Sequence, residues 1–264
     1  MNKIDLRRNR ILKYLSLNPI ASRANLAKMF DVTPETIRKD LDALEKEKLV
    51  ARVHGGVALI GTRKSDFEYD LRLNKNHDKK MIIAKAASKL IEPNDVIILE
   101  SSTTTYELTK VLLTMPDLLK TLVIITNSVG IATLMKHEDF PKRFYLLGGW
   151  LNMNEHATQG SAMLHALKDF HVNKSFISGA ALNKNWVLTG YYDNDVAFQK
   201  QAIESAQTSI LLIDSSKFYE SSILTVCQLS ALDYMVTDAV LDEKNRIAIE
   251  STGIKIVTVP PCHS

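Results

Sequence analysis

Apolar residues in the first fifty positions recur at the spacing of short amphipathic helices. The pattern predicts helices over residues 5–17, residues 23–30 and residues 34 to about 46. Ser22 and Thr33 stand where the second and third helices begin, and both side chains suit an N-cap. The inward faces carry Leu6, Ile11, Leu12 and Leu15, then Leu26 and Phe30, then Ile37, Leu41 and Leu44. The second and third helices, joined by a short polar turn, match the helix-turn-helix pattern.

A β-hairpin is predicted directly after the third helix. Two short alternating runs between Leu49 and Leu59 flank the pair Gly55-Gly56. A hairpin behind the second helix of a helix-turn-helix is a wing, and that second helix reads the major groove of DNA with its N-terminal residues. Residues 1–60 are therefore predicted to form a winged helix-turn-helix DNA-binding domain.

The candidates for DNA contact are polar side chains that the inward face leaves exposed. They are Thr33, Glu35, Thr36, Arg38 and Lys39 on the third helix, and Arg52 and His54 on the hairpin. Thr36 suits a base edge or a thymine methyl group, whereas Arg38 and Lys39 suit guanine or phosphate. The alternative is a solvated surface helix with ordinary ion pairs, such as Glu35 with Lys39.

The rest of the chain alternates short apolar runs with helical stretches. Residues 61–77 are polar, lack a sustained period and predict a linker. Beyond them, helices are expected at 78–91, 106–113, 128–136, 161–170, 196–206 and 242–251, and strands at 96–99, 122–126, 144–147, 175–178, 210–213, 234–237 and 254–259. This alternation predicts an α/β fold over residues 78–264, with a doubly wound, mostly parallel sheet.

Four of the predicted strands end in loops rich in polar groups, where ligands of doubly wound sheets bind. The hydroxyl-rich loop Glu100–Thr105 opens a helix, and free N–H groups at a helix N-terminus suit a phosphate. The other three ends are Thr126–Ser128, Gly148-Gly149 and Asp214–Phe218. Together they suit a phosphorylated sugar or polyol. The alternative for each loop is structural, since Ser, Thr and Asn also cap helices and Gly-Gly turns the chain.

Charge divides the chain in the same place as the hydrophobic pattern does. Residues 1–64 hold 14 Lys and Arg against 7 Asp and Glu, which leaves 19 basic and 23 acidic residues of the chain's 33 and 30 for the remainder. A basic module on a mildly acidic one suggests binding to a polyanion. The two cysteines, Cys227 and Cys262, lack metal-site or disulfide-framework spacing, so no metal or cofactor is expected. Without a signal peptide or an apolar run of roughly 20 residues, the chain is expected to be cytoplasmic.

The segment LAKMFDVTPETIRKDLDALEKEKLVARVHGGV resembles the DeoR family of bacterial regulators. The family's TIRRDL helix matches Thr36–Leu41, with Lys39 in place of an arginine. Its RxHGG wing matches Arg52–Gly56. The substitution at Lys39 keeps the charge and loses the bidentate geometry of arginine.

The resemblance extends to the larger part of the chain, where the family has a domain similar to ribose-phosphate isomerase that senses sugars or sugar phosphates. The family's DxGTTT, TNS, LGG and DxSKF elements match the four loops at the strand ends. The resemblance therefore implies an effector site formed by Glu100, Ser102, Thr103, Thr104, Thr105, Asn127, Ser128, Gly148, Gly149, Lys200 and Lys217. Glu100 stands where the family has Asp, and Ser102 and Leu182 where it has Gly. These departures affect the identity or affinity of the effector more than they affect the fold.

The resemblance implies a sequence-specific transcription regulator rather than an enzyme. Its expected partners are double-stranded operator DNA, a phosphorylated sugar or polyol, and further copies of itself. We expect a repressor of a carbohydrate operon. The residues do not decide whether the protein represses or activates transcription, or whether it forms a dimer or a tetramer. One alternative is a sugar-phosphate isomerase, for which Glu100, Asp195, Asp214 and Lys217 supply acid and base groups. Another is a constitutive DNA-binding protein whose larger domain only oligomerises.

Overall fold

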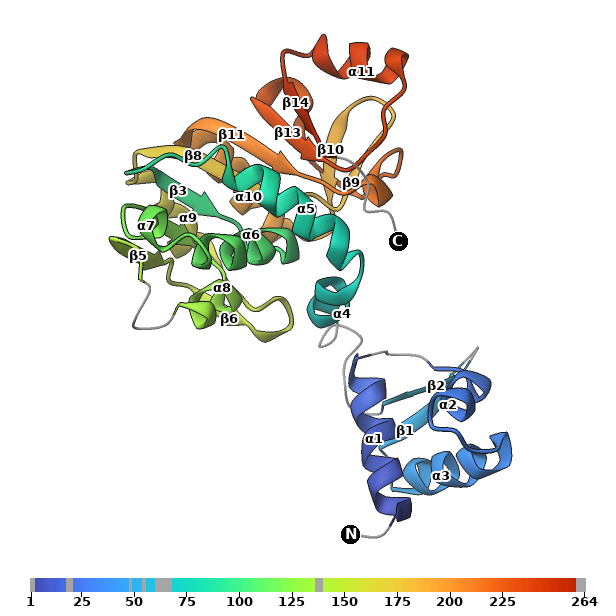
Figure 1. Ribbon diagram of the computed structural model, residues 1–264. Coiled ribbons are helices and arrows are strands. Elements are labelled where there is room, and N and C mark those ends of the chain that lie inside the picture. The colour runs from blue at the N-terminus through green and yellow to red at the C-terminus, as the bar shows by residue number, and fades with distance from the viewer. Residues whose placement is uncertain are drawn as a thin grey trace. The chain divides into compact units, whose positions relative to one another are not determined.

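The protein folds as two compact units, residues Met1–Lys75 and Asn76–Ser264, each of which has its own core. The computed structural model describes residues 3–17, 21–47, 49–53, 56–59, 68–135 and 140–259 (Figure 1). His54 and Cys262, both singled out in the sequence, lie outside the described residues.

The N-terminal unit has the helices and hairpin that the sequence predicts. Its elements are α1 (Lys3–Leu17), α2 (Arg23–Met29), α3 (Pro34–Lys46), β1 (Val50–Val53), β2 (Gly56–Leu59) and α4 (Glu68–Asn74). The two predicted N-caps are confirmed, because Ser22 Oγ accepts from the Asn25 N–H at 3.1 Å and Thr33 Oγ1 from the Thr36 N–H at 3.2 Å. Helix α4 falls within the range predicted as a linker. Its apolar residues Tyr69, Leu71 and Leu73 recur at a spacing of two, so the segment lacks the helical period.

Both apolar packing and one buried acid hold α3 in place. Ile37, Leu41 and Leu44 are buried against residues of α1, α2 and the hairpin. Asp40 is only 2% exposed, and its carboxylate accepts hydrogen bonds from Arg7 at 2.5 Å and Arg8 at 3.2 Å. The buried charge of Asp40 is therefore compensated by two cations of α1, which fixes the orientation of α3 on its neighbour.

The second unit is built on a seven-stranded sheet in which every pairing is parallel. The strands are β3 (Val96–Leu99), β4 (Val123–Thr126), β5 (Arg143–Leu146), β8 (Val172–Ile177), β11 (Ala206–Leu212), β13 (Tyr234–Thr237) and β14 (Lys255–Thr258). Their order across the sheet is β14-β13-β11-β8-β3-β4-β5. The chain thus builds outward from β3 to β5 and then crosses back to β8, so strand order reverses between β3 and β8. All seven predicted strands belong to this sheet, and β3 and β13 have the predicted bounds.

Helices cover both faces of the sheet, which makes the unit a doubly wound α/β fold. One face packs against α5 (His77–Ser88), α6 (Thr103–Leu113), α7 (Pro116–Leu119) and α8 (Val129–Leu134), and the other against α9 (Ser161–Lys168), α10 (Asp193–Ser205) and α11 (Glu243–Glu250). Alternation along a strand sets this arrangement. In β3, Ile97 and Leu99 belong to the core under α5–α8, and Ile98 belongs to the core under α9–α11. The inner strands β3 and β4, each with three of four residues buried, read as nearly continuous apolar runs, as expected for a parallel sheet covered on both sides.

Two small antiparallel sheets were not predicted. The first pairs β6 (Trp150–Asn152) with β7 (Ala157–Gln159), and the second has the order β12 (Leu224–Gln228), β10 (Val187–Gly190), β9 (Ala181–Leu182). Three of these strands have only two or three residues, and β10 and β12 mix apolar with polar residues, so they lack the continuous apolar runs of the predicted strands. Three short 3₁₀ turns complete the described part of the unit, at Met153–Glu155, Ser215–Lys217 and Leu229–Ala231.

The neighbouring glycines 148 and 149, which connect β5 to β6, should respond differently to a methyl group. A Cβ on Gly149 would lie 2.3 Å from the backbone oxygen of Gln159, whereas a Cβ on Gly148 would meet nothing within 4 Å. We expect Gly149→Ala to lower the free energy of unfolding by about 1–3 kcal/mol, because backbone must move. Gly148→Ala is the matched control and should change it by less than about 1 kcal/mol. Urea unfolding of both variants measures the difference, and equal stabilities would contradict this account of the turn.

Candidate functional site

The recognition helix α3 presents its predicted DNA-contacting residues away from the core. Glu35, Arg38 and Lys39 are exposed and Thr36 is half-buried, while Ile37 and Leu41 face inward. Thr33 is also exposed, but its hydroxyl is engaged within the helix itself, since it caps α3 and lies 2.9 Å from the Thr36 hydroxyl. The helix therefore presents Arg38 and Lys39, together with the acid Glu35, on a solvent-exposed face.

Three carboxylates hold Arg38 of this helix and Arg52 of the wing in place. Arg38 forms a bidentate pair with Glu35, at 2.7 and 3.0 Å, and reaches Asp42 at 3.2 Å. Glu35 thus pairs with Arg38 rather than with Lys39, and Arg38 holds the pKa of the exposed Glu35 carboxyl below its usual value. Arg52 of the wing contacts Glu45 at 3.0 Å and also Asp42.

Asp42 therefore joins the recognition helix to the wing, because its two oxygens contact Arg38 and Arg52. These pairs are exposed, so each contributes little to stability. Their consequence is geometric: both guanidinium groups are oriented before any ligand arrives. A phosphate that approaches them meets preformed donors, although it must compete with the carboxylates that hold them.

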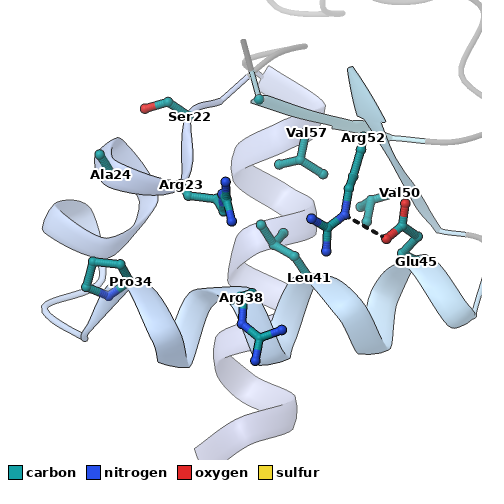
Figure 2. A pocket seen from close by; sticks show the side chains of 11 residues that line it. Ser22, Arg23, Ala24, Pro34, Arg38, Leu41, Glu45, Val50, Arg52 and Val57 are labelled. Atoms are coloured by element: carbon teal, nitrogen blue, oxygen red, sulfur yellow. Dashed lines mark hydrogen bonds and ion pairs between the residues drawn. The ribbon is translucent and has the colours of Figure 1, made fainter. Parts of the chain in front are cut away.

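A hollow of about 590 Å³ lies between α2, α3 and the wing, with arginines on three sides. Arg23 comes from the start of α2, Arg38 from α3 and Arg52 from β1 (Figure 2). Arg23 was not among the predicted site residues. Its place at the start of the second helix, beside Ser22, was a signal that could have suggested it, because helix N-termini also bind phosphate.

In the second unit, Glu100 lies at the point where strand order reverses. Glu100 directly follows β3, and Ser178 directly follows β8. The Glu100 carboxylate accepts a hydrogen bond from the Ser178 N–H at 2.5 Å. The Nε2 of Gln199 on α10 donates to the other carboxylate oxygen at 2.6 Å and to the Ser178 carbonyl at 3.0 Å. Ligands of doubly wound sheets bind at this switch point. The side chains of Glu100 and Gln199 and the backbone of Ser178 thus lie at the edge of the sheet where a ligand is expected.

The environment of Glu100 favours its neutral form. The side chain is buried, and burial raises its pKa from 4.5 to about 8. The hydrogen bonds from Ser178 and Gln199 oppose this shift, as does the positive charge of Lys217, while the charge of Asp195 adds to it. Asp195 in turn accepts from Gln159 Nε2 at 3.0 Å. The structure therefore brings Glu100, Asp195 and Lys217 within electrostatic reach of one another.

Lys217 is held against the loop that follows β8. Its ammonium donates to the Gly179 carbonyl at 2.6 Å and lies 3.5 Å from the Ser178 hydroxyl. Because Glu100 accepts from the Ser178 N–H, a predicted cation and a predicted acid of the effector site meet at one loop. Neither Ser178 nor Gln199 was predicted. Ser178 directly follows a strand of the sheet, which is the signal that could have found it.

Several hydroxyl groups of the predicted effector site are engaged in the framework. Ser102 caps α6 by accepting from the Thr105 N–H at 3.2 Å, and Thr105 Oγ1 donates to the Glu100 carbonyl at 2.5 Å. Thr103 and Thr104, in the first turn of α6, are buried. The loop after β3 is thereby fixed around the start of α6.

The loops after β4 and β5 form a second part of the framework. Asn127 accepts from the Ser101 N–H at 2.9 Å and donates to the Thr158 carbonyl at 3.4 Å, and Ser128 caps α8. Gly149 lies against the backbone of Gln159, while Gly148 opens onto free space. Asn127 and Gly149 thus hold β7, and β7 carries Gln159 toward Asp195.

Lys200 lies apart from these contacts, exposed on α10, where its charge lowers the pKa of Cys227 against the larger effect of burial. Burial raises the pKa of that thiol to about 11, so Cys227 stays protonated and unreactive at neutral pH. Within the described ranges, no cluster of three or more His, Cys, Asp or Glu side chains could hold a metal ion. Over those same ranges, none of the helices has the length and hydrophobicity needed to span a bilayer.

A winged helix-turn-helix with a basic face, joined to a doubly wound unit with a polar switch point, defines the class of ligand-sensing DNA-binding regulators. Residues 7–63 match the DeoR-like helix-turn-helix domain, and residues 75–239 match the DeoR C terminal sensor domain. The chain belongs to the DeoR family of transcriptional regulators, as the sequence motifs indicated.

Relatives of similar length extend this likeness over nearly the whole chain. An uncharacterized HTH-type transcriptional regulator of Bacillus subtilis, YulB, is 30% identical over 96% of both chains. The HTH-type transcriptional repressor GlcR of B. subtilis is 26% identical over 94% of this chain and 93% of that one. The glycerol-3-phosphate regulon repressor of Escherichia coli is 28% identical over 88% of this chain and 90% of that one. These relatives are regulators rather than enzymes.

The buried carboxyl of Glu100 should make the stability of the protein depend on pH. Between about pH 4.5 and pH 8, the folded protein keeps a proton on Glu100 that the unfolded chain has lost, so the free energy of unfolding falls as pH rises through this window. Each pKa unit corresponds to about 1.4 kcal/mol, which is an upper bound on the loss per pH unit.

Glu100→Gln removes this contribution. We expect the stability of the variant relative to the native protein to rise as pH increases from about 6 to about 9. Urea unfolding at both pH values measures the change, and any pH-independent cost of the new amide cancels in the comparison. A stability difference that is the same at both pH values would show that Glu100 is ionised throughout.

Proposed function

We propose that this protein is a repressor of a carbohydrate operon, and that a phosphorylated sugar or polyol bound at the switch point of the sensor unit releases it from DNA. Two relatives described above are named as repressors, and one of them as the repressor of the glycerol-3-phosphate regulon. The observation that carries the proposal is the meeting of Glu100 and Lys217 at the Ser178 loop, in a chain that also holds a winged helix-turn-helix.

The DNA-binding role rests on the charge and exposure of α3 and the wing. Arg38 and Lys39 lie in the first half of the helix, which enters the major groove in this fold. Arg52 and Arg23 flank the helix and suit phosphates on either side of the groove. His54 lies outside the described residues, and its proposed contact with DNA rests on the sequence motif alone. Operator sites bound by proteins of this kind are commonly paired, so we propose that the protein acts as a homo-oligomer.

The effector role rests on complementary groups at the switch point. A phosphate suits the Lys217 ammonium and the N–H groups at the start of α6, and a sugar hydroxyl suits the Glu100 carboxyl. Glu100 in neutral form also donates a hydrogen bond, which a carboxylate does not. Release from DNA requires the effector to bind the DNA-free state more tightly than the DNA-bound state.

The contribution of Arg38 to DNA binding is testable on a duplex recovered by in vitro selection with the full-length protein. We expect Arg38→Ala to weaken binding to that duplex by about 1–3 kcal/mol and to relax base preference at one position. Lys46→Ala, an exposed lysine in the last turn of the same helix, is the matched control. Fluorescence anisotropy measures both affinities. Equal losses on selected and unrelated duplexes, with a shallower salt dependence, would show that Arg38 contacts only phosphate.

The effector proposal predicts a thermal shift with a phosphorylated ligand. The panel contains D-ribose 5-phosphate, fructose 1-phosphate and glycerol 3-phosphate, each paired with its unphosphorylated counterpart. A compound that binds the native state at a hundred times its Kd stabilises it by about 2.7 kcal/mol. We expect Lys217→Ala to abolish the shift and Lys184→Ala, an exposed lysine before β10, to preserve it. A shift that survives Lys217→Ala would place the phosphate elsewhere, and a sensor unit that only oligomerises would give no shift.

A further inference from the structure

The first residue of the sensor unit uses its side chain on a distant loop instead of on its own helix. Asn76 occupies the N-cap position of α5 in a left-handed conformation, with φ of 55°, and makes no side-chain cap for that helix. Its Nδ2 donates instead to Asp214 Oδ1 at 3.2 Å and to the Ser216 hydroxyl at 2.9 Å. These partners are 138 and 140 residues away along the chain. An asparagine that suits capping is thus committed to a tertiary contact.

Lys79, three residues further along α5, contacts the same loop. Its ammonium donates to the Ser215 hydroxyl at 2.7 Å and lies 3.5 Å from Asp238, which follows β13. Asp238 is buried and accepts from both the N–H and the hydroxyl of Ser215, at 2.7 and 2.9 Å. The first turn of α5 therefore holds the loop through two side chains and one buried acid.

The loop held in this way carries the lysine of the effector site. Asp214, Ser215 and Ser216 directly precede Lys217, and Ser215–Lys217 form a single 3₁₀ turn. A shift of this turn that carries Lys217 toward a bound phosphate would change the geometry of the residues that Asn76 and Lys79 hold. The contacts to the loop and the contacts of Lys217 cannot all stay fixed if the turn shifts.

The contacts of Asn76 and Lys79 with the Asp214–Lys217 loop, called the link below, matter because of where Asn76 lies in the chain. The boundary between the two compact units falls between Lys75 and Asn76, and helix α4 ends at Asn74. The effector loop is thus tied to the residue at which the sensor unit begins, one residue from the unit that carries the recognition helix.

We propose that Asn76 and Lys79 are positioning residues that couple the Lys217 loop to the unit boundary, so that the occupancy of the effector site sets operator affinity through them. The proposal rests on the proposed function. The contacts of Asn76 and Lys79 are formed in the structure, and the proposal assigns them to the conformation that binds operator DNA. Loss of the link should therefore mimic the effector and weaken operator binding, although neither side chain belongs to the DNA-binding unit.

The test measures the Kd of the ligand-free, full-length protein for the duplex selected with the native protein. Asn76→Gly removes the side chain and keeps the left-handed backbone available. Ser216→Ala removes the hydroxyl that accepts the hydrogen bond from Asn76 Nδ2. We expect Asn76→Gly to raise the operator Kd about fivefold or more, within the usual range of allosteric coupling. The double variant should bind no more weakly than Asn76→Gly alone, because that variant has already lost the Asn76 hydrogen bonds to both Asp214 and Ser216.

Matched controls separate coupling from other effects. Lys85 is exposed on the same helix, and the Asn245 amide donates to Asp242 at the start of α11 instead of to the loop. Lys85→Ala and Asn245→Ala should each leave the operator Kd within about twofold. Lys79→Ala should weaken binding with an unchanged slope of log Kd against log salt, since no phosphate contact is lost. A reduced slope would show that Lys79 touches DNA directly and would overturn its assignment.

Urea unfolding of each variant confirms that it is folded at the assay temperature. An unchanged operator Kd for folded Asn76→Gly and folded Ser216→Ala would overturn the proposal while the proposed function stands. If the native protein enriches no duplex in the selection, the proposed function fails instead. The two failures are thereby distinguishable.

Discussion

The parallel sheet of the sensor unit is the constraint on which its chemistry depends. Because every pairing in the seven-stranded sheet is parallel, all its strands end at one edge, and loops far apart in sequence meet there. The reversal of strand order between β3 and β8 places Glu100 beside Ser178, and α10 adds Gln199 at the same point. Burial of the Glu100 carboxyl follows from this placement, as does the raised pKa. The chemistry of the site is thus a consequence of topology.

Charge plays a different part in the DNA-binding unit. Asp40 is buried between two arginines of α1 and fixes the recognition helix on its support. Asp42, two residues further along and facing outward, contacts the helix arginine Arg38 and the wing arginine Arg52. One acid therefore stabilises the scaffold, and the other orients two arginines that are proposed to contact DNA. Such preorganisation reduces the ordering cost that flexible arginines bring to an interface.

The sequence predicted the parts of this fold that have a strong period and missed those that depend on distant contacts. The runs at Val96–Leu99 and Tyr234–Thr237 are continuous and apolar, so their strands were placed at the observed bounds. The strands β6, β7 and β9 have two or three residues, β10 and β12 mix apolar with polar residues, and α4 lies in a polar stretch. Motif matching singled out Glu100 and Lys217, which the structure brings to the same loop. It could not find Asn76, whose partners lie about 140 residues away and whose left-handed backbone has no local signature.

The central claim is that a small molecule in the sensor unit and operator DNA at the recognition helix are linked through one protein. Linkage is reciprocal, so the most direct test measures it from both sides. For a phosphorylated compound that stabilises the protein, operator Kd is measured with and without the compound, and the Kd of the compound is measured with and without operator. The account predicts that both constants rise by the same factor, about fivefold or more. A compound that binds the sensor unit while both constants stay unchanged would contradict it.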